Sequence, residues 1–161
     1  MPIGANLAAY FFDTSALVKL YVAEAGSDLV ASLVLATERP DIVISVVAEV
    51  EFASAWSRKL RAGEMNIRDA EEIWRYFEED LRARFRVRGV DAAVVASAAR
   101  LAKLHQLRAY DALQLASCLE SSASRTAHGH EPLVFVCGDR KLTKVAEAEG
   151  VDCTLADDAM K

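Results

Sequence analysis

The chain has 161 residues, of which 53% are hydrophobic and 27% are charged, and its formal net charge is −5. This composition excludes a disordered chain, no apolar run approaches the length of a membrane span, and the length predicts one domain over residues 1–161. The acidic balance argues against binding nucleic acid by bulk charge alone. The three cysteines lack CxxC spacing and no basic region precedes the first apolar run, so we expect a cytoplasmic protein with reduced thiols and no signal peptide.

Short apolar runs alternate with segments of helical period along the chain. Strands are predicted near residues 7–12, 42–44, 132–137 and 151–155. Helices are predicted near residues 15–23, 29–34, 45–60, 66–81, 92–105, 110–119 and 139–150, and the polar stretch 121–131 is predicted to be a loop. Strands that alternate with helices predict an α/β fold with a parallel sheet covered on both faces.

Two aspartates stand where predicted strands give way to helices. Asp13 directly follows the first apolar run, and Asp139 follows the run that ends at Cys137. Parallel strands end at the same edge of a sheet, so two carboxylates far apart in the sequence can converge there. The alternative for each aspartate is that it only caps the helix that follows.

Three further acids are candidates for the same edge. Asp111 shares an apolar helical stripe with Leu115, where an unpaired carboxylate is costly and should meet a cation or a hydrogen-bond partner. The alternative is a buried ion pair with an arginine such as Arg108. Glu49 and Glu51 lie on the long helix after residue 45 and point in different directions. Apolar periodicity favours Glu49 as the inward acid, but an uncertain helix start would rotate that answer.

Several carboxylates gathered at one sheet edge repel one another, and divalent cations remove that repulsion. Hard oxygen ligands select magnesium or manganese over zinc. A paired-metal carboxylate site aligns a water and stabilises both the attacking and the leaving oxygen of a phosphodiester displacement. The acids therefore predict metal-dependent hydrolysis of nucleic acid.

Four stretches, in order, also carry a family likeness. They are Phe12-Asp13-Thr14-Ser15-Ala16-Leu17-Val18-Lys19, then Glu51-Phe52-Ala53-Ser54-Ala55 through Gly63-Glu64, then Arg108-Ala109-Tyr110-Asp111-Ala112-Leu113-Gln114-Leu115-Ala116, and Asp139-Arg140-Lys141-Leu142 through Gly150. With these stretches the chain resembles a PIN-domain ribonuclease of the VapC toxin type. The resemblance implies a three-layer α/β/α sandwich around a mainly parallel sheet of four or five strands.

The resemblance also implies the site and its partners. The catalytic and metal-binding acids would be Asp13, Glu51, Asp111 and Asp139, with Ser15 in support and Mg²⁺ as the cofactor, Mn²⁺ being the alternative. The family motif begins at Glu51 and so overrules the periodicity that favours Glu49. Cys137 departs from the family pattern, in which a threonine or serine often stands two residues before the last acid. The implied partners are single-stranded RNA, a small VapB-like antitoxin that blocks the pocket, and a second copy in a homodimer.

Two other interpretations of the acids stay open. A haloacid-dehalogenase-like phosphatase also places an aspartate after its first strand, but it needs a second one two residues later, where Ser15 stands. A non-catalytic interaction protein could use its acids to hold a structural cation.

Residues 82–88 alternate arginine with apolar residues. One interpretation is a strand that presents arginines to phosphates, and the favoured interpretation is a solvated face or a helix end.

Overall fold

The computed structural model describes residues 8–36 and 39–157. Its centre is one sheet in the order β3-β2-β1-β4-β5, with every neighbouring pair parallel. The strands are β1 (Ala9–Phe12), β2 (Asp41–Ser45), β3 (Arg86–Arg88), β4 (Val134–Cys137) and β5 (Cys153–Leu155). The predicted parallel sheet is confirmed; Leu7, the expected start of the first strand, lies outside the described residues.

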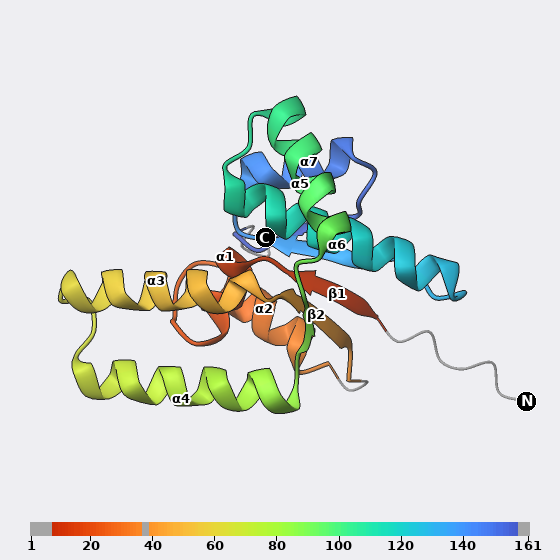
Figure 1. Cartoon of the computed structure of the whole chain (residues 1–161). Coiled ribbons are helices and arrows are strands. Elements are labelled where there is room, and N and C mark those ends of the chain that lie inside the picture. The colour runs from red at the N-terminus through yellow and green to blue at the C-terminus, as the bar shows by residue number, and fades with distance from the viewer. Residues whose placement is uncertain (1–7, 37–38, 158–161) are drawn as a thin grey trace, which may run out of the picture.

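The helices cover both faces of this sheet. They are α1 (Thr14–Leu17), the 3₁₀ helix η1 (Val18–Leu20), α2 (Ser27–Val34), α3 (Val47–Arg61), α4 (Ile67–Ala83), α5 (Ala92–His105), α6 (Ala109–Ala127) and α7 (Arg140–Ala148). Figure 1 shows α3 and α4 as an adjacent pair on one side of the sheet and α5 and α7 on the other. No helix in the described ranges is long and apolar enough to cross a membrane.

Each face of the sheet has its own hydrophobic core, because successive strand residues point to opposite faces. Phe11 and Phe135 pack with side chains of α5, α6 and α7, such as Leu115. Phe12 and Ile44 pack in the second core with the helices between α1 and α4. The central strands β1, β2 and β4 are therefore apolar at successive positions, as is typical of parallel strands buried on both faces. The three-layer α/β/α sandwich is confirmed.

The predicted loop 121–131 is wrong over most of its length, because α6 continues to Ala127. Serine and threonine suggested a loop, but the Thr126 hydroxyl donates to the carbonyl oxygens of Ser122 and Ala123 in the preceding turn. Hydroxyls that bond back in this way are compatible with a helix. The helix ends only where Gly129 takes a φ of 77°.

Residues 86–88 form the edge strand β3 instead of the favoured helix end, since α4 already ends at Ala83. The arginines of this strand are paired with acids of the same chain. Arg86 Nε lies 3.3 Å from Asp41 Oδ1, and Arg88 Nη2 lies 2.7 Å from Asp91 Oδ2. These ion pairs partly neutralise Arg86 and Arg88, which leaves less positive charge on β3 to bind a phosphate.

The second core predicts a large effect of truncating Phe77. This ring is fully buried and stacks on Phe52 with 4.0 Å between centroids. Phe77→Ala should lower the free energy of unfolding by about 3–5 kcal/mol through lost burial and a residual cavity. Tyr76→Ala, at the next position and 45% exposed, should cost about 1 kcal/mol or less. Urea titration of both variants checks this; equal losses would contradict the assignment of this core.

Candidate active site

Asp13 stands where β1 ends and α1 begins, and it is only 6% exposed. Its Oδ2 accepts from the Ser15 backbone N–H at 3.1 Å and from the Ser15 hydroxyl at 2.5 Å. Asp13 is therefore a helix cap, which is one of the two roles predicted for it. The capping bonds use only one carboxylate oxygen, because both go to Oδ2 and neither involves Oδ1.

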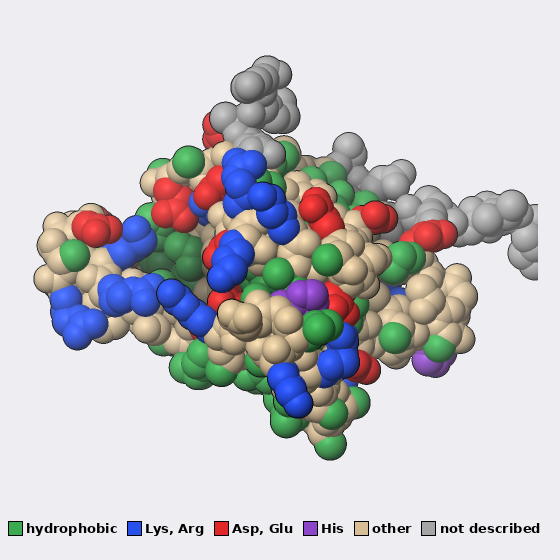
Figure 2. All heavy atoms as spheres, turned by 90° about the horizontal axis from the view of Figure 1, so that it is seen from above, with side chains coloured by type: hydrophobic (Ala, Val, Ile, Leu, Met, Phe, Trp, Pro, Cys, Tyr) green, Lys and Arg blue, Asp and Glu red, His purple; other side chains and the backbone are tan. Residues whose placement is uncertain are grey.

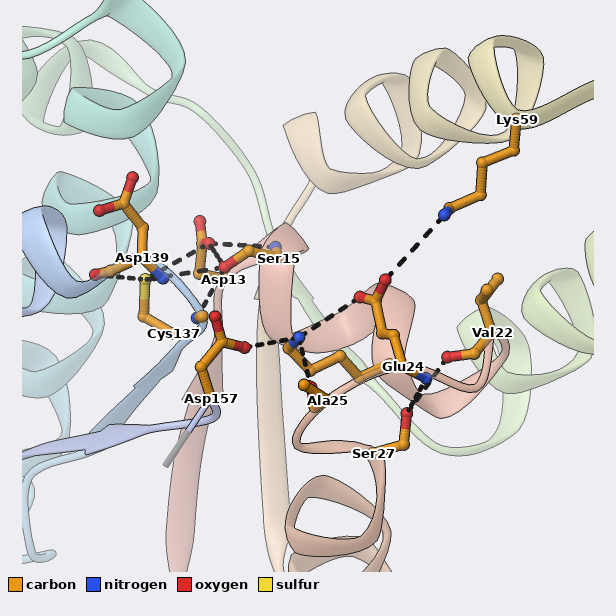
Figure 3. A network of polar contacts seen from close by, with 12 residues as sticks. Asp13, Ser15, Val22, Glu24, Ala25, Ser27, Lys59, Cys137, Asp139 and Asp157 are labelled. Carbon is orange, nitrogen blue, oxygen red and sulfur yellow. Dashed lines mark hydrogen bonds and ion pairs between the residues drawn. The ribbon is translucent and has the colours of Figure 1, made fainter. Parts of the chain in front are cut away.

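Asp139 takes the matching place after β4. Its Oδ1 accepts from the backbone N–H groups of Lys141 (2.7 Å) and Leu142 (3.1 Å), so it caps α7. Figure 3 shows Asp13 and Asp139 at neighbouring strand ends with their carboxylates on the same side. The adjacency of β1 and β4 in the sheet thus brings together two acids that are 126 positions apart in sequence.

Cys137 and Ser15 join these two strand ends, as Figure 3 shows. The Ser15 hydroxyl accepts from the Gly138 N–H at 2.8 Å. The Cys137 sulfur accepts from the Asp139 N–H at 3.2 Å and donates to Asp13 Oδ2 at 3.6 Å. The thiol therefore makes the contacts expected of a hydroxyl at this position, at the longer distances of sulfur.

Gly138 is held against Lys19, directly behind this network. A Cβ at Gly138 would lie 3.1 Å from Lys19 Cε and 3.3 Å from Ser15 Oγ. Lys19 is itself only 8% exposed, and its Nζ bonds to the Ala25 carbonyl and to Asp157 Oδ1, both at 2.7 Å. These contacts, drawn in Figure 3, anchor the segment after β5 beside the site.

Glu51 on α3 points toward α1 and α6. Its Oε2 accepts from the Thr14 hydroxyl at 2.8 Å and from Gln114 Nε2 at 2.5 Å. Glu49 is exposed. The direction indicated by the family motif is thus the one the helix adopts, and the direction favoured by apolar periodicity is not. Sequence reasoning missed the roles of Thr14 and Gln114; the signal for the second was a glutamine inside the apolar run 112–116.

Asp111 lies in the first turn of α6 and is half-buried. Burial raises the pKa of its carboxyl, and the charge of Asp139 raises it further, while Arg108 and Lys141 oppose this. In the described part of the chain Asp111 does not form the ion pair with Arg108 that was its alternative interpretation. Its charge is therefore balanced only in part by the protein.

The pKa values of Asp13 and Glu51 are raised as well. Burial raises the pKa of Asp13 and so does the charge of Asp111, although hydrogen bonds from Ser15 and Cys137 lower it. Burial raises the pKa of Glu51, with further contributions from Asp13 and Asp111, against hydrogen bonds from Gln114 and Thr14. Electrostatic contacts thus link the four acids: Asp139 acts on Asp111, Asp111 acts on Asp13 and Glu51, and Asp13 acts on Glu51. We call these four linked carboxylates the acidic site.

The donor set of this site suits a hard divalent cation. Carboxylate oxygens prefer Mg²⁺ or Mn²⁺, and a cation would offset both the burial and the mutual repulsion that raise these pKa values. Within the described ranges, no three histidine, cysteine, aspartate or glutamate side chains are already arranged to hold a metal ion. The charges and donor atoms fit a cation, and the acids would have to close on it.

The face of the molecule seen in Figure 2 carries side chains of both charges. Figure 2 shows lysine and arginine side chains interspersed with acidic ones on the face seen from above. This mixed surface agrees with the net charge of −5. Positive charge at the acidic site comes from a few residues, of which Arg108 and Lys141 act directly on Asp111.

Because the pKa of Asp111 is raised, the protein is expected to be less stable when this carboxylate is ionised than when it is neutral. A group whose pKa is higher in the folded state stabilises fully below its unfolded pKa, and this contribution is lost as pH rises through the folded value. Asp111→Asn should therefore raise the melting temperature at pH 7 without divalent cations, and the gain should shrink as pH falls toward about 3.9. Thermal denaturation across pH measures this.

Asp69 gives a matched control, because it is an exposed aspartate in the first turn of α4. Asp69→Asn should lower the melting temperature slightly, since an acid at a helix start is favourable. Opposite signs for the two substitutions are expected. A lower melting temperature for Asp111→Asn at pH 7 would contradict the raised pKa of Asp111.

Comparison with known proteins identifies the family. The family described as PIN domain matches residues 10–148. Ribonuclease VapC45 of Mycobacterium tuberculosis (strain CDC 1551 / Oshkosh) and Ribonuclease VapC49 of Mycobacterium tuberculosis (strain ATCC 25618 / H37Rv) are each 36% identical to this chain over 144 residues, which is 87% of this chain and 90% of each relative.

Solved structures agree on the fold. PAE2754 from Pyrobaculum aerophilum is 22% identical with a TM-score of 0.61, over 94% of this chain and 88% of that one. VapBC2 from Rickettsia felis, bound to a DNA fragment from their promoter, contains a chain 14% identical with a TM-score of 0.62, over 91% of this chain and 98% of that one. The family prediction made from the four motifs is confirmed: the chain belongs to the PIN domain family and is a VapC-type member of it.

Proposed function

We propose that this chain is a magnesium-dependent endoribonuclease, formed by a single domain over residues 1–161, and the toxin of a toxin–antitoxin pair. The observation that carries the proposal is the acidic site of Asp13, Glu51, Asp111 and Asp139 at one sheet edge, in a PIN domain chain. Its relatives that are 36% identical are named ribonucleases. The family assignment favours this function over the phosphatase interpretation.

Each acid has a distinct place in the proposed site. Asp13 and Asp111 would be the principal ligands of the cation, and Glu51 and Asp139 would complete the set. A bound Mg²⁺ or Mn²⁺ supplies positive charge and acidifies a coordinated water at neutral pH. Ser15 holds Asp13 through the 2.5 Å hydrogen bond from its hydroxyl, which limits the rotation of that carboxylate. One of the four acids would also orient the attacking water.

Single-stranded RNA is the substrate that we assign to this site. The phosphodiester chemistry is common to all RNA, and an unpaired strand can bring its backbone close to carboxylates at a sheet edge. Arg108 and Lys141, which act on the charge of Asp111, would contact the phosphate. The mixed surface charge implies that local contacts, instead of long-range attraction, hold the strand.

The proposed partners are a small VapB-like antitoxin that covers the acidic site and a second copy of the chain. Support comes from the VapC-type relatives and from exposed apolar side chains near the site. Val46 is 41% exposed and Val50 is 58% exposed, both at the start of α3. Apolar side chains in such positions favour contacts between proteins.

The first prediction for this function concerns Asp13. Asp13→Asn should abolish cleavage of single-stranded RNA, and EDTA should abolish cleavage by the natural chain until Mg²⁺ is restored. The fold should survive, because asparagine also caps helices and carries no buried charge. Asp28→Asn, which changes an exposed aspartate of α2, is the matched control and should cleave normally. Cleavage by Asp13→Asn, or cleavage in EDTA, would refute the assigned site; binding of RNA without cleavage would favour the non-catalytic alternative.

The second prediction separates the two glutamates of α3. Glu51→Gln should reduce the cleavage rate by about 10–100-fold, because a neutral amide replaces one charged ligand. Glu49→Gln should leave the rate unchanged, since Glu49 is exposed. Cleavage rates at fixed Mg²⁺ concentration compare the two variants. Equal effects, or a larger effect at Glu49, would contradict the orientation of α3 toward the site.

A further inference from the structure

Gln114 lies one turn after Asp111 on α6 and is fully buried. Its Nε2 donates to Glu51 Oε2 at 2.5 Å and to Thr14 Oγ1 at 2.8 Å. The Thr14 hydroxyl donates to the same Glu51 oxygen at 2.8 Å. Side chains from α1, α3 and α6 therefore close a triangle of hydrogen bonds around one carboxylate oxygen.

The hydrogen bonds donated by Nε2, and not the volume of the side chain, explain why a glutamine occupies position 114. Gln114 Oε1 is buried and has no hydrogen-bond partner among the described residues. An unpaired buried oxygen is destabilising, and methionine would fill a similar volume without one. Turning the amide over would set its oxygen against a carboxylate oxygen of Glu51, so charge fixes the orientation with Nε2 toward Glu51. Because the unpaired Oε1 destabilises the fold, we look for a role of Gln114 in the acidic site.

That role concerns the direction of the Glu51 side chain. Glutamate has three rotatable bonds, and the like charges of Asp13 and Asp111 push its carboxylate away from the site. Gln114 and Thr14 oppose this movement with two donors on Oε2. Oε1 takes no part in the triangle, so the carboxylate is held by one oxygen while the other stays available to a ligand.

We propose that Gln114 is a positioning residue: through its amide it holds Glu51 at the acidic site and links α6, which carries Asp111, to α3 and α1. This proposal rests on the proposed function, in which Glu51 helps to hold the cation. Gln114 touches neither the cation nor the RNA, and it acts only through Glu51. Its loss should therefore weaken cation binding, while the core around it stays intact.

Gln114→Met tests the proposal, because it removes both the donors and the orphan oxygen at similar volume. The Mg²⁺ concentration for half-maximal RNA cleavage should rise by about 10–100-fold, as for residues that orient metal ligands. The melting temperature without Mg²⁺ should stay equal or rise. In a Glu51→Gln background the same substitution should add little, because its effect passes through the Glu51 carboxylate.

Two further variants distinguish positioning from packing. Ser117→Ala removes another buried hydroxyl of α6, which donates to Ser45 at 3.2 Å and touches none of the four acids. It should change the melting temperature and leave the Mg²⁺ dependence unaltered. Thr14→Val breaks the triangle from its other corner and should reproduce the Mg²⁺ shift, so the proposal is still decided if Gln114→Met does not fold.

Titration with Mg²⁺ alone, followed by calorimetry, separates this proposal from the proposed function. Weaker Mg²⁺ binding by Gln114→Met supports positioning even if the natural chain cleaves no RNA, which would refute the nuclease alone. An unchanged Mg²⁺ dependence in a natural chain that cleaves RNA overturns positioning alone. Equal shifts in the presence and absence of the Glu51 carboxylate also overturn it, and a natural chain that neither binds Mg²⁺ nor cleaves RNA overturns both.

Discussion

Burial of carboxylates that also repel one another, near the carboxyl ends of β1 and β4, is the constraint on which the candidate site depends. Burial makes this repulsion stronger, because Asp13 is almost fully removed from water and Asp111 and Glu51 are partly removed. The fold offsets it with local donors. Asp13 and Asp139 accept hydrogen bonds at the starts of α1 and α7, and Asp111 lies in the first turn of α6. Helix starts carry partial positive charge, so three of the four acids lie where the backbone itself favours an anion.

This arrangement explains why capping and site formation are not competing interpretations of Asp13 and Asp139. A cap uses one carboxylate oxygen, and a cation needs access to another. Each aspartate accepts its capping bonds on a single oxygen, Oδ2 in Asp13 and Oδ1 in Asp139. The capping bonds also fix the side chain, so they orient the remaining oxygen. The helix start therefore both stabilises the fold and shapes the site.

The residues differ in how far the sequence predicts them. Asp13 and Asp139 can be predicted because each follows an apolar strand. In a parallel sheet these strands end at the same edge, which brings the two aspartates together. Glu51 follows from the family motif but not from periodicity, because the apolar face of α3 packs on α4 as well as on the sheet and the stripe is broad. The length of α6 is missed because residues 121–127 are rich in serine and threonine, and such a stretch is also compatible with a helix when a hydroxyl, here that of Thr126, bonds back to the preceding turn. Gln114 is missed because its donors serve a residue 63 positions away, which no local pattern reports.

Cys137 shows how a departure from a family pattern can keep the physical contact. The thiol lies between Asp13 and the Asp139 N–H, where a hydroxyl is usual, and it is fully buried. Burial raises the pKa of this thiol, and the charge of Asp13 adds to the effect, so it stays protonated and acts as a donor. Sulfur bonds are longer and weaker than those of oxygen. The two strand ends therefore depend more on the Ser15 hydroxyl, which bonds both Asp13 and Gly138, than they would with threonine at position 137. With cysteine at position 137, Asp13 is therefore oriented mainly by Ser15 in the first turn of α1 and less by the end of β4.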